Sequence, residues 1–136
     1  MTVGGWLSAA QASSGQLAVE VSGFNTVEGQ LCVRLFPSSH GFPGESDRAL
    51  QSFCTAVAEE TQVVTFEDVE AGTYAVALFH DINGDNAVNR NFLGMPVEGV
   101  GFSRNPTLVM GPPDFEEAVI LVAGTATDIQ IQLRYF

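Results

Sequence analysis

Alternation of apolar and polar residues with a period of two is the feature that most constrains the fold of this chain. It is clearest in the stretch TDIQIQLRYF, where Ile129, Ile131 and Leu133 are separated by polar residues. Successive side chains of a β-strand point to opposite faces of a sheet, so the pattern predicts a strand with one buried face. The same pattern, or a run of β-branched residues, predicts strands at residues 17–24, 29–37, 62–69, 70–81, 117–124 and 127–136.

These strands indicate an all-β fold, because no amphipathic pattern is longer than about two helical turns. We expect a Greek-key antiparallel β-sandwich of about seven strands, immunoglobulin-like or transthyretin-like, with a long ordered loop. The 136 residues suffice for one domain, which we place at residues 16–136. Tyr74 begins a strand after an acidic turn, which predicts a tyrosine corner. The link NTVEG before residue 30 is short enough for a hairpin.

Residues 38–50 are rich in turn formers and charges, and we expect a surface loop there with one helical turn near residues 47–53. Residues 1–15 carry a small-x-small pattern, Ala10-Gln11-Ala12, of the kind that signal peptidase recognises. We interpret them as the remnant of a signal peptide or as a disordered leader. The protein would then be exported to a periplasm, a lumen or a cell surface, and would be cytoplasmic if Met1 is the true start.

The charge balance limits the classes of partner that the protein can bind. Sixteen Asp and Glu stand against five Arg, no Lys is present, and the formal net charge is −11. A nucleic acid needs a cationic surface to release its counterions, so we expect no nucleic-acid partner. We also expect no insertion into a membrane, since no apolar stretch is long enough to cross one.

Cys32 and Cys54 are the only cysteines. In an exported protein they would form a disulfide, whereas in a cytosolic protein they would be two buried thiols. With His40 they do not make a zinc set.

The stretch HDINGDNAVNRNFLG, residues 80–94, resembles the start of a calcium loop. Counted from Asp81, oxygen-bearing side chains occupy positions 1, 3, 5 and 9, and position 7 would supply a backbone carbonyl. The residues at these positions are Asp81, Asn83, Asp85, Asn89 and, for the carbonyl, Ala87. This spacing suits a hard cation, and calcium is the one cofactor that we expect.

The end of the loop departs from the EF-hand pattern. Position 6 is Asn86 instead of glycine, and position 12 is Phe92 instead of glutamate, so a complete EF-hand is excluded. Glu98 or Asp114 could complete the shell from outside the loop. The competing interpretation is a metal-free turn, since Asn and Asp tolerate left-handed backbone and bond their own chain.

The segment NFLGMPVEGVGFSRNP, residues 91–106, contains more glycine and apolar residues than a plain connector needs. Gly94, Gly99 and Gly101 permit positive φ, apolar side chains can pack beneath the loop, and two arginines flank it. We therefore expect a binding surface or a structural cover. The ligand-binding candidates are His80, Arg90, Phe92, Met95, Phe102 and Arg104.

Two motifs, GTYAVALFHDINGD at residues 72–85 and NFLGMPVEGVGFSRN at 91–105, together with LCVRLF, resemble the bacterial domain-of-unknown-function family numbered 2141. The resemblance covers residues 16–136 and implies a small exported β-sandwich, similar in style to transthyretin-like and carboxypeptidase-regulatory-like modules. Such modules serve as accessory, adhesive or ligand-binding domains of the bacterial envelope. The resemblance brings no settled activity. The positions that carry it are His80, Asp81, Asn83, Asp85, Gly94, Pro96, Glu98, Gly99, Gly101 and Phe102.

We therefore expect a non-enzymatic, exported binding or structural module of the bacterial envelope, stabilised by calcium. Its ligand would be a protein or a small molecule that the sequence does not identify. One alternative is a small hydrolase or isomerase that uses His80 with Asp81 or Glu98 as an acid-base pair. The other is a subunit of a larger envelope assembly, whose sign would be an exposed apolar patch.

Overall fold

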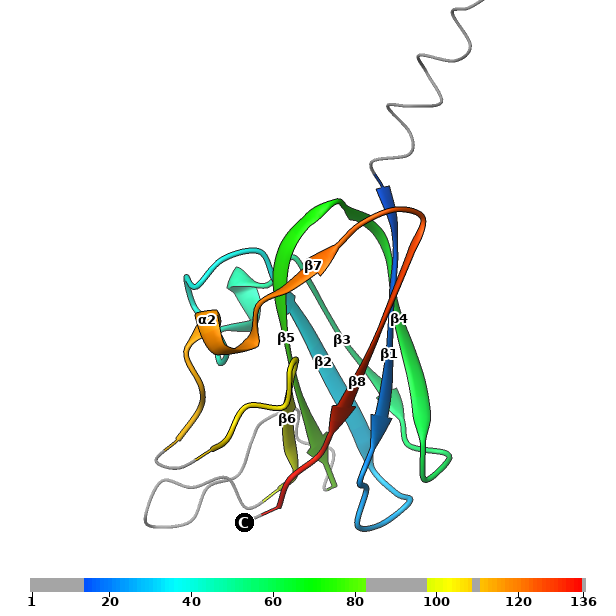
Figure 1. The fold of residues 1–136 in the computed structure, drawn as a ribbon. Helices are drawn as coiled ribbons and strands as arrows, with labels where there is room; N and C mark the ends of the chain where they lie inside the picture. The colour runs from blue at the N-terminus through cyan, green and yellow to red at the C-terminus, as the bar shows by residue number, and fades with distance from the viewer. Residues whose placement is uncertain (1–13, 83–97, 109–110, 136) are drawn as a thin grey trace, which may run out of the picture.

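The structure, a computed structural model, describes residues 14–82, 98–108 and 111–135 (Figure 1). Within these residues the chain forms two β-sheets that pack face to face, which confirms the predicted all-β sandwich. The strands are β1 (Ser14–Ser22), β2 (Gln30–Phe36), β3 (Gln51–Ala56), β4 (Gln62–Glu70), β5 (Gly72–Asp81), β6 (Val100–Phe102), β7 (Ile120–Val122) and β8 (Ala126–Gln132). Two short helical segments, η1 (Ser46–Arg48) and α2 (Phe115–Ala118), lie in the connections.

The first sheet has the order β4-β1-β8, and the second has the order β3-β2-β5-β6, with β7 paired to the start of β5. Strands β1 and β8 run parallel, unlike the other pairs, because the chain enters β8 from the same end of the sandwich as β1 (Figure 1). Strands β1 and β2 lie in different sheets. The link NTVEG is therefore a crossover between the sheets, and the expectation of a hairpin was wrong.

The main core lies between the two sheets. Alternate residues of β1, β2, β5 and β8 point into it, and Ile131 and Leu133 of the predicted alternating stretch lie in it. Its largest fully buried side chains are Phe66, Leu17, Leu31, Leu35 and Ile131. Burial of this apolar surface is the main stabilising contribution to the fold.

A second apolar cluster covers the outer face of the second sheet. Ala75, Ala77 and Phe79 of β5 pack there against Phe36, Phe102 and Ala118, with Phe42 and Phe115 partly buried beside them. Both faces of β5 are consequently covered, and every residue of the strand from Tyr74 to Asp81 is buried. The apolar run YAVALF reflects this double burial.

A tyrosine corner joins the two sheets where β4 turns into β5. The Tyr74 hydroxyl donates a hydrogen bond of 2.7 Å to the backbone carbonyl of Glu70. This confirms the prediction made from the strand start at Gly72. The bond fixes the angle at which the chain leaves the first sheet and enters the second.

Three elements differ from the sequence-based expectation. Only Ser46–Arg48 is helical in the 38–50 region, and residues 51–56 form β3 instead of completing a helical turn. The segment predicted as a long loop ends in β6, which extends the second sheet beside β5. The predicted leader, residues 1–15, lies outside the described residues except for Ser14 and Gly15, which begin β1.

Cys32 and Cys54 form a disulfide with an S–S distance of 2.02 Å. The two cysteines are direct partners in the register of β2 and β3, so the bond ties the edge strand β3 to its neighbour. Strand β3 has few buried residues of its own, as its burial pattern shows. The covalent link therefore holds an edge strand that packing alone anchors weakly.

We predict that the variant C32A/C54A is less stable than the wild type by about 3 kcal/mol, because the unfolded chain regains the entropy that the cross-link removes. Urea denaturation of both proteins measures this difference. Reductant should destabilise the wild type by a similar amount and leave the variant unchanged. Equal unfolding midpoints for the wild type and the variant without reductant would contradict the prediction.

Candidate functional site

A cluster of buried polar side chains lies at the end of β5, next to the segment that the sequence marked as functional. His80 and Asp81 are 0% exposed and Glu98 is 5% exposed. Burial of ionisable groups is costly unless they are hydrogen bonded or paired, so such a cluster requires specific partners. Ser103, at the end of β6, is the other buried polar side chain among the described residues.

Both ring nitrogens of His80 are hydrogen bonded. Nε2 lies 2.7 Å from the backbone carbonyl of Glu28, and Nδ1 lies 2.8 Å from the Tyr135 hydroxyl. A carbonyl only accepts, so Nε2 carries the proton, and Nδ1 of the neutral ring accepts from Tyr135. The same hydroxyl accepts a 3.2 Å bond from the Asn25 backbone N–H. The network fixes the tautomer of His80 and joins β5 to the β1–β2 crossover and the C-terminus.

Aromatic packing completes the surroundings of His80. The rings of Phe24 and Tyr135 meet the imidazole edge to face, with centroids 5.2 Å and 6.1 Å away. Burial raises the pKa of the Tyr135 phenol, and the hydrogen bond from Asn25 offsets part of that rise. His80 is thus held between two aromatic rings and two hydrogen bonds, with no face open to solvent.

Asp81 and Glu98, two described carboxylates of the predicted calcium set, lie at the same end of the sandwich, whereas the alternative ligand Asp114 is the N-cap residue of α2. Glu98 accepts a 2.8 Å hydrogen bond from the backbone N–H of Ile82, the residue that follows Asp81. The chain therefore returns to the end of β5 at the residue that we expected to complete the metal shell. The other predicted ligands, Asn83, Asp85, Ala87 and Asn89, lie outside the described residues, as do the ligand-binding candidates Arg90, Phe92 and Met95.

Within residues 14–82, 98–108 and 111–135, no group of three or more His, Cys, Asp or Glu side chains is arranged to hold a metal ion. Asp81 and Glu98 supply two carboxylates, whereas calcium takes six to eight oxygen ligands. The described residues are therefore compatible with part of a calcium shell and do not make a complete one.

Gly99 and Gly101 serve close packing. A Cβ atom on Gly99 would lie 2.5 Å from the Tyr135 ring, and one on Gly101 would lie 2.7 Å from Ile131. The left-handed backbone expected at these two glycines is not observed, because neither has a φ in the positive range. It occurs instead at Arg104 and Asn105, with φ of 69° and 47°. Gly101 lets β6 approach β8, and Gly99, just before β6, lets the chain approach Tyr135, the partner of His80.

The remaining described candidates have structural contacts. Phe102 is 7% exposed and packs on Phe42 in the second apolar cluster. Arg104 is exposed, and its Nη1 donates to the backbone carbonyl of Glu116. His40 is exposed in the loop before η1. Of the predicted site, the structure thus brings together His80, Asp81 and Glu98, and it places Phe102 in a core.

Several residues of the cluster were missed by the sequence analysis. Tyr135 stands in an alternating strand pattern that gave no sign of a buried hydrogen bond. Asn105 binds the edge of β8 through its side chain, accepting from the Gln132 N–H at 2.9 Å and donating to the Gln130 carbonyl at 3.4 Å. Ser103 donates to the Ala118 carbonyl and accepts from the Val76 N–H. No local sequence pattern marks such long-range contacts.

The fold and the cluster define a class: a disulfide-linked β-sandwich domain with a buried polar network at one end. The chain belongs to the family of uncharacterised proteins conserved in bacteria known as DUF2141, which it matches over residues 19–130. The resemblance drawn from the two motifs is therefore confirmed. No curated protein and no solved structure matches the chain significantly. No helix among the described residues is long and apolar enough to cross a membrane.

We predict that Gly99→Ala destabilises the protein by about 1–3 kcal/mol, because the new methyl group overlaps the Tyr135 ring and displaces the partner of His80. Thermal or urea unfolding measures the loss. Gly44→Ala is the matched control, since nothing lies within 4 Å of a Cβ at that position. Equal stability of the two variants would show that the ring moves aside without cost.

A second prediction concerns alkaline pH. Because burial raises the pKa of Tyr135, the folded protein keeps a proton that the unfolded chain releases above pH about 10. Stability is therefore expected to fall as the pH rises through that value toward the folded pKa. Tyr135→Phe should be less stable at pH 7 by about 1 kcal/mol, since His80 loses its donor.

The decline in stability above pH 10 should be shallower in Tyr135→Phe than in the wild type. Urea denaturation of both proteins at several pH values between 7 and 11 measures the stability difference at pH 7 and the slope above pH 10. Parallel curves for the two proteins would contradict the assigned role of the phenol.

Proposed function

We propose that this protein is an exported, non-catalytic binding or structural module of the bacterial envelope, and that calcium organises its functional end. The observation that carries the proposal is the position of Asp81 and Glu98. These two buried carboxylates flank the Asn-rich and Asp-rich stretch, and Glu98 accepts a hydrogen bond from the N–H of Ile82, the residue that follows Asp81. Export is supported by the Cys32–Cys54 disulfide, since such bonds persist in oxidising compartments.

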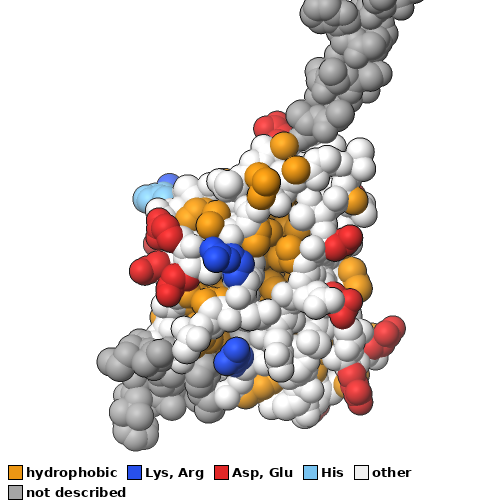
Figure 2. Space-filling view, viewed as in Figure 1, with side chains coloured by type: hydrophobic (Ala, Val, Ile, Leu, Met, Phe, Trp, Pro, Cys, Tyr) orange, Lys and Arg blue, Asp and Glu red, His pale blue; other side chains and the backbone are white. Residues whose placement is uncertain are grey.

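A binding role is supported by the face on which β5, β7 and β8 lie. Figure 2 shows hydrophobic side chains gathered over the middle of this face, basic groups among them and acidic groups toward both sides. Among the apolar side chains of β7 and β8, Ile120 and Ile129 are only partly buried against the main core, and Leu121 is 66% exposed. Apolar groups with a few convergent charges are typical of recognition surfaces.

Calcium suits the chemistry of this end of the molecule. Carboxylate and amide oxygens are the ligands that a hard cation prefers. Asp81 and Glu98 would be carboxylate ligands of the ion. Bound calcium would stabilise the folded state by mass action and would hold the two ends of the connection together.

The non-catalytic part of the proposal is supported by the hydrogen bonds of His80. A general base needs a nitrogen within hydrogen-bond reach of the proton that it removes. In this structure one nitrogen of His80 donates to a backbone carbonyl and the other accepts from Tyr135, and the ring is fully buried. The acid-base alternative would require His80 to break one of these bonds and become exposed.

Thermal unfolding in calcium and in chelator tests the proposal. At a calcium concentration about tenfold above its Kd, we expect a stability gain of about 1.4 kcal/mol, which raises Tm by about 5 °C. Asp81→Asn and Glu98→Gln should each lose most of this shift. Each variant is compared with itself in the two conditions, so that any loss of intrinsic stability cancels.

Glu116→Gln is the matched control, because Glu116 is an exposed carboxylate on α2 and should leave the calcium shift unchanged. Identical Tm values of the wild type in calcium and in chelator would remove calcium from the proposal. A shift that survives in both Asp81→Asn and Glu98→Gln would place the ion elsewhere.

A further inference from the structure

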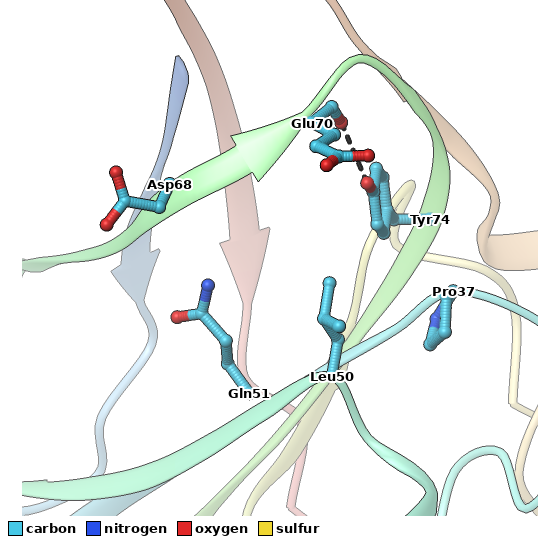
Figure 3. Close-up of a pocket in the computed structure, with 6 residues that line it drawn as sticks. All are labelled: Pro37, Leu50, Gln51, Asp68, Glu70 and Tyr74. Carbon is cyan, nitrogen blue, oxygen red and sulfur yellow. Dashed lines mark hydrogen bonds between the residues drawn. The ribbon is translucent and has the colours of Figure 1, made fainter. Parts of the chain in front are cut away.

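A groove lies at the opposite end of β5 from His80. It is lined by Pro37, Leu50, Gln51, Asp68, Glu70 and Tyr74 and has a volume of about 450 Å³ (Figure 3). Three parts of the fold contribute: the end of β2, the start of β3 and the corner between β4 and β5. This volume falls within the range of small-ligand sites in proteins.

Hydrogen bonds hold the walls of the groove in place. Tyr74 is fixed by its bond to the Glu70 carbonyl, which Figure 3 shows as a dashed line. Across the groove, the Gln51 side chain donates a 2.7 Å bond to the Glu67 carbonyl, which ties the start of β3 to β4. A site with fixed walls loses little entropy when a ligand binds.

The groove presents apolar surface to solvent at its base. Leu50 is 53% exposed, although it is a large aliphatic side chain, and Figure 3 shows it pointing up between Gln51 and Tyr74. Pro37 stands beside it, also exposed. A ligand with a short hydrocarbon chain would cover this surface and remove it from water.

Two carboxylates supply the charge. Asp68 and Glu70 are exposed, and neither forms an ion pair with any residue that the structure describes. They lie on either side of Val69 in β4, and both line the groove. Burial raises the pKa of the Tyr74 phenol, and the negative charge of Glu70 raises it further.

We propose that this groove binds a small organic cation whose positive groups are joined by a short alkyl chain, of the diamine or guanidino-amine class. The chain would lie on Leu50 and Pro37, and the positive groups would meet Asp68 and Glu70. Charge complementarity favours this class, because the groove contributes two negative groups and no basic side chain. The site is separate from the calcium end, so either proposal can fail without the other.

A second depression offers a matched comparison. It lies on the outer face of the first sheet, has a volume of about 320 Å³, and also carries two carboxylates, Glu20 and Asp128. It is a hollow over flat strands and lacks an aromatic ring and a corner. If two neighbouring carboxylates were sufficient for binding, a cation would bind in this second depression equally well.

Titration of the protein with agmatine, which has a guanidinium and an ammonium on a four-carbon chain, tests the proposal. We expect saturable amide shifts in NMR spectra at Leu50, Gln51 and Tyr74, and an affinity that falls with added salt. The neutral probe 1,4-butanediol should produce no saturable shifts there. The double variant D68N/E70Q should bind agmatine about tenfold more weakly or worse.

The variants keep the test interpretable. Asp68 has a φ of 56°, a backbone conformation that asparagine also tolerates, so the Asp68→Asn change preserves the fold. The double variant E20Q/D128N serves as the control and should bind agmatine as the wild type does. Unchanged affinity in D68N/E70Q, an equal loss in the control variant, or shifts spread over both depressions would overturn the proposal.

Discussion

The structure depends on burying both faces of β5. One face of this strand packs in the main core between the sheets, and the other packs in the second apolar cluster. A two-sheet sandwich covers only one face of each sheet, so the second face must be covered by connections. The loop around Phe42 and the segment that leads into α2 perform this task. Arg34 packs beside this second cluster. Its guanidinium lies 5.4 Å from the Phe79 ring centroid and donates a hydrogen bond to the Gly44 carbonyl.

The polar residues at the two ends of β5 follow from the same constraint. A strand that is buried throughout has no solvent to satisfy the polar groups where it begins and ends. At the start, Tyr74 satisfies the Glu70 carbonyl. At the end, His80 satisfies the Glu28 carbonyl and receives a hydrogen bond from Tyr135. The end of β5 is therefore tied to distant parts of the chain, whereas its start is tied to the corner four residues before Tyr74.

Residues that suggested chemistry in the sequence have mostly structural contacts in the fold. His80 was a candidate acid-base residue, and its nitrogens bind the backbone of the β1–β2 crossover and the C-terminal tyrosine. Phe102 packs in the second cluster. The interpretation of Asp81 and Glu98 as calcium ligands stays a prediction, and the structure places Glu98 beside Ile82, the residue that follows Asp81.

The sequence by itself determined the fold class, the strands with clean alternation and the tyrosine corner, because these features depend on local periodicity and local residue types. For the two cysteines it left a disulfide and a pair of buried thiols as alternatives, and the structure shows the disulfide. It did not reveal β3, whose burial is slight, or the crossover after β1, since a link of hairpin length fits either topology.

Only the tertiary structure decided which groups form hydrogen bonds with His80, why Gly99 has no side chain and where a groove forms. The partners of His80 are up to 55 positions away in the chain, and the groove combines residues from 37 to 74. Contacts of that separation arise from the packing of two sheets, and no local pattern of residue types records them.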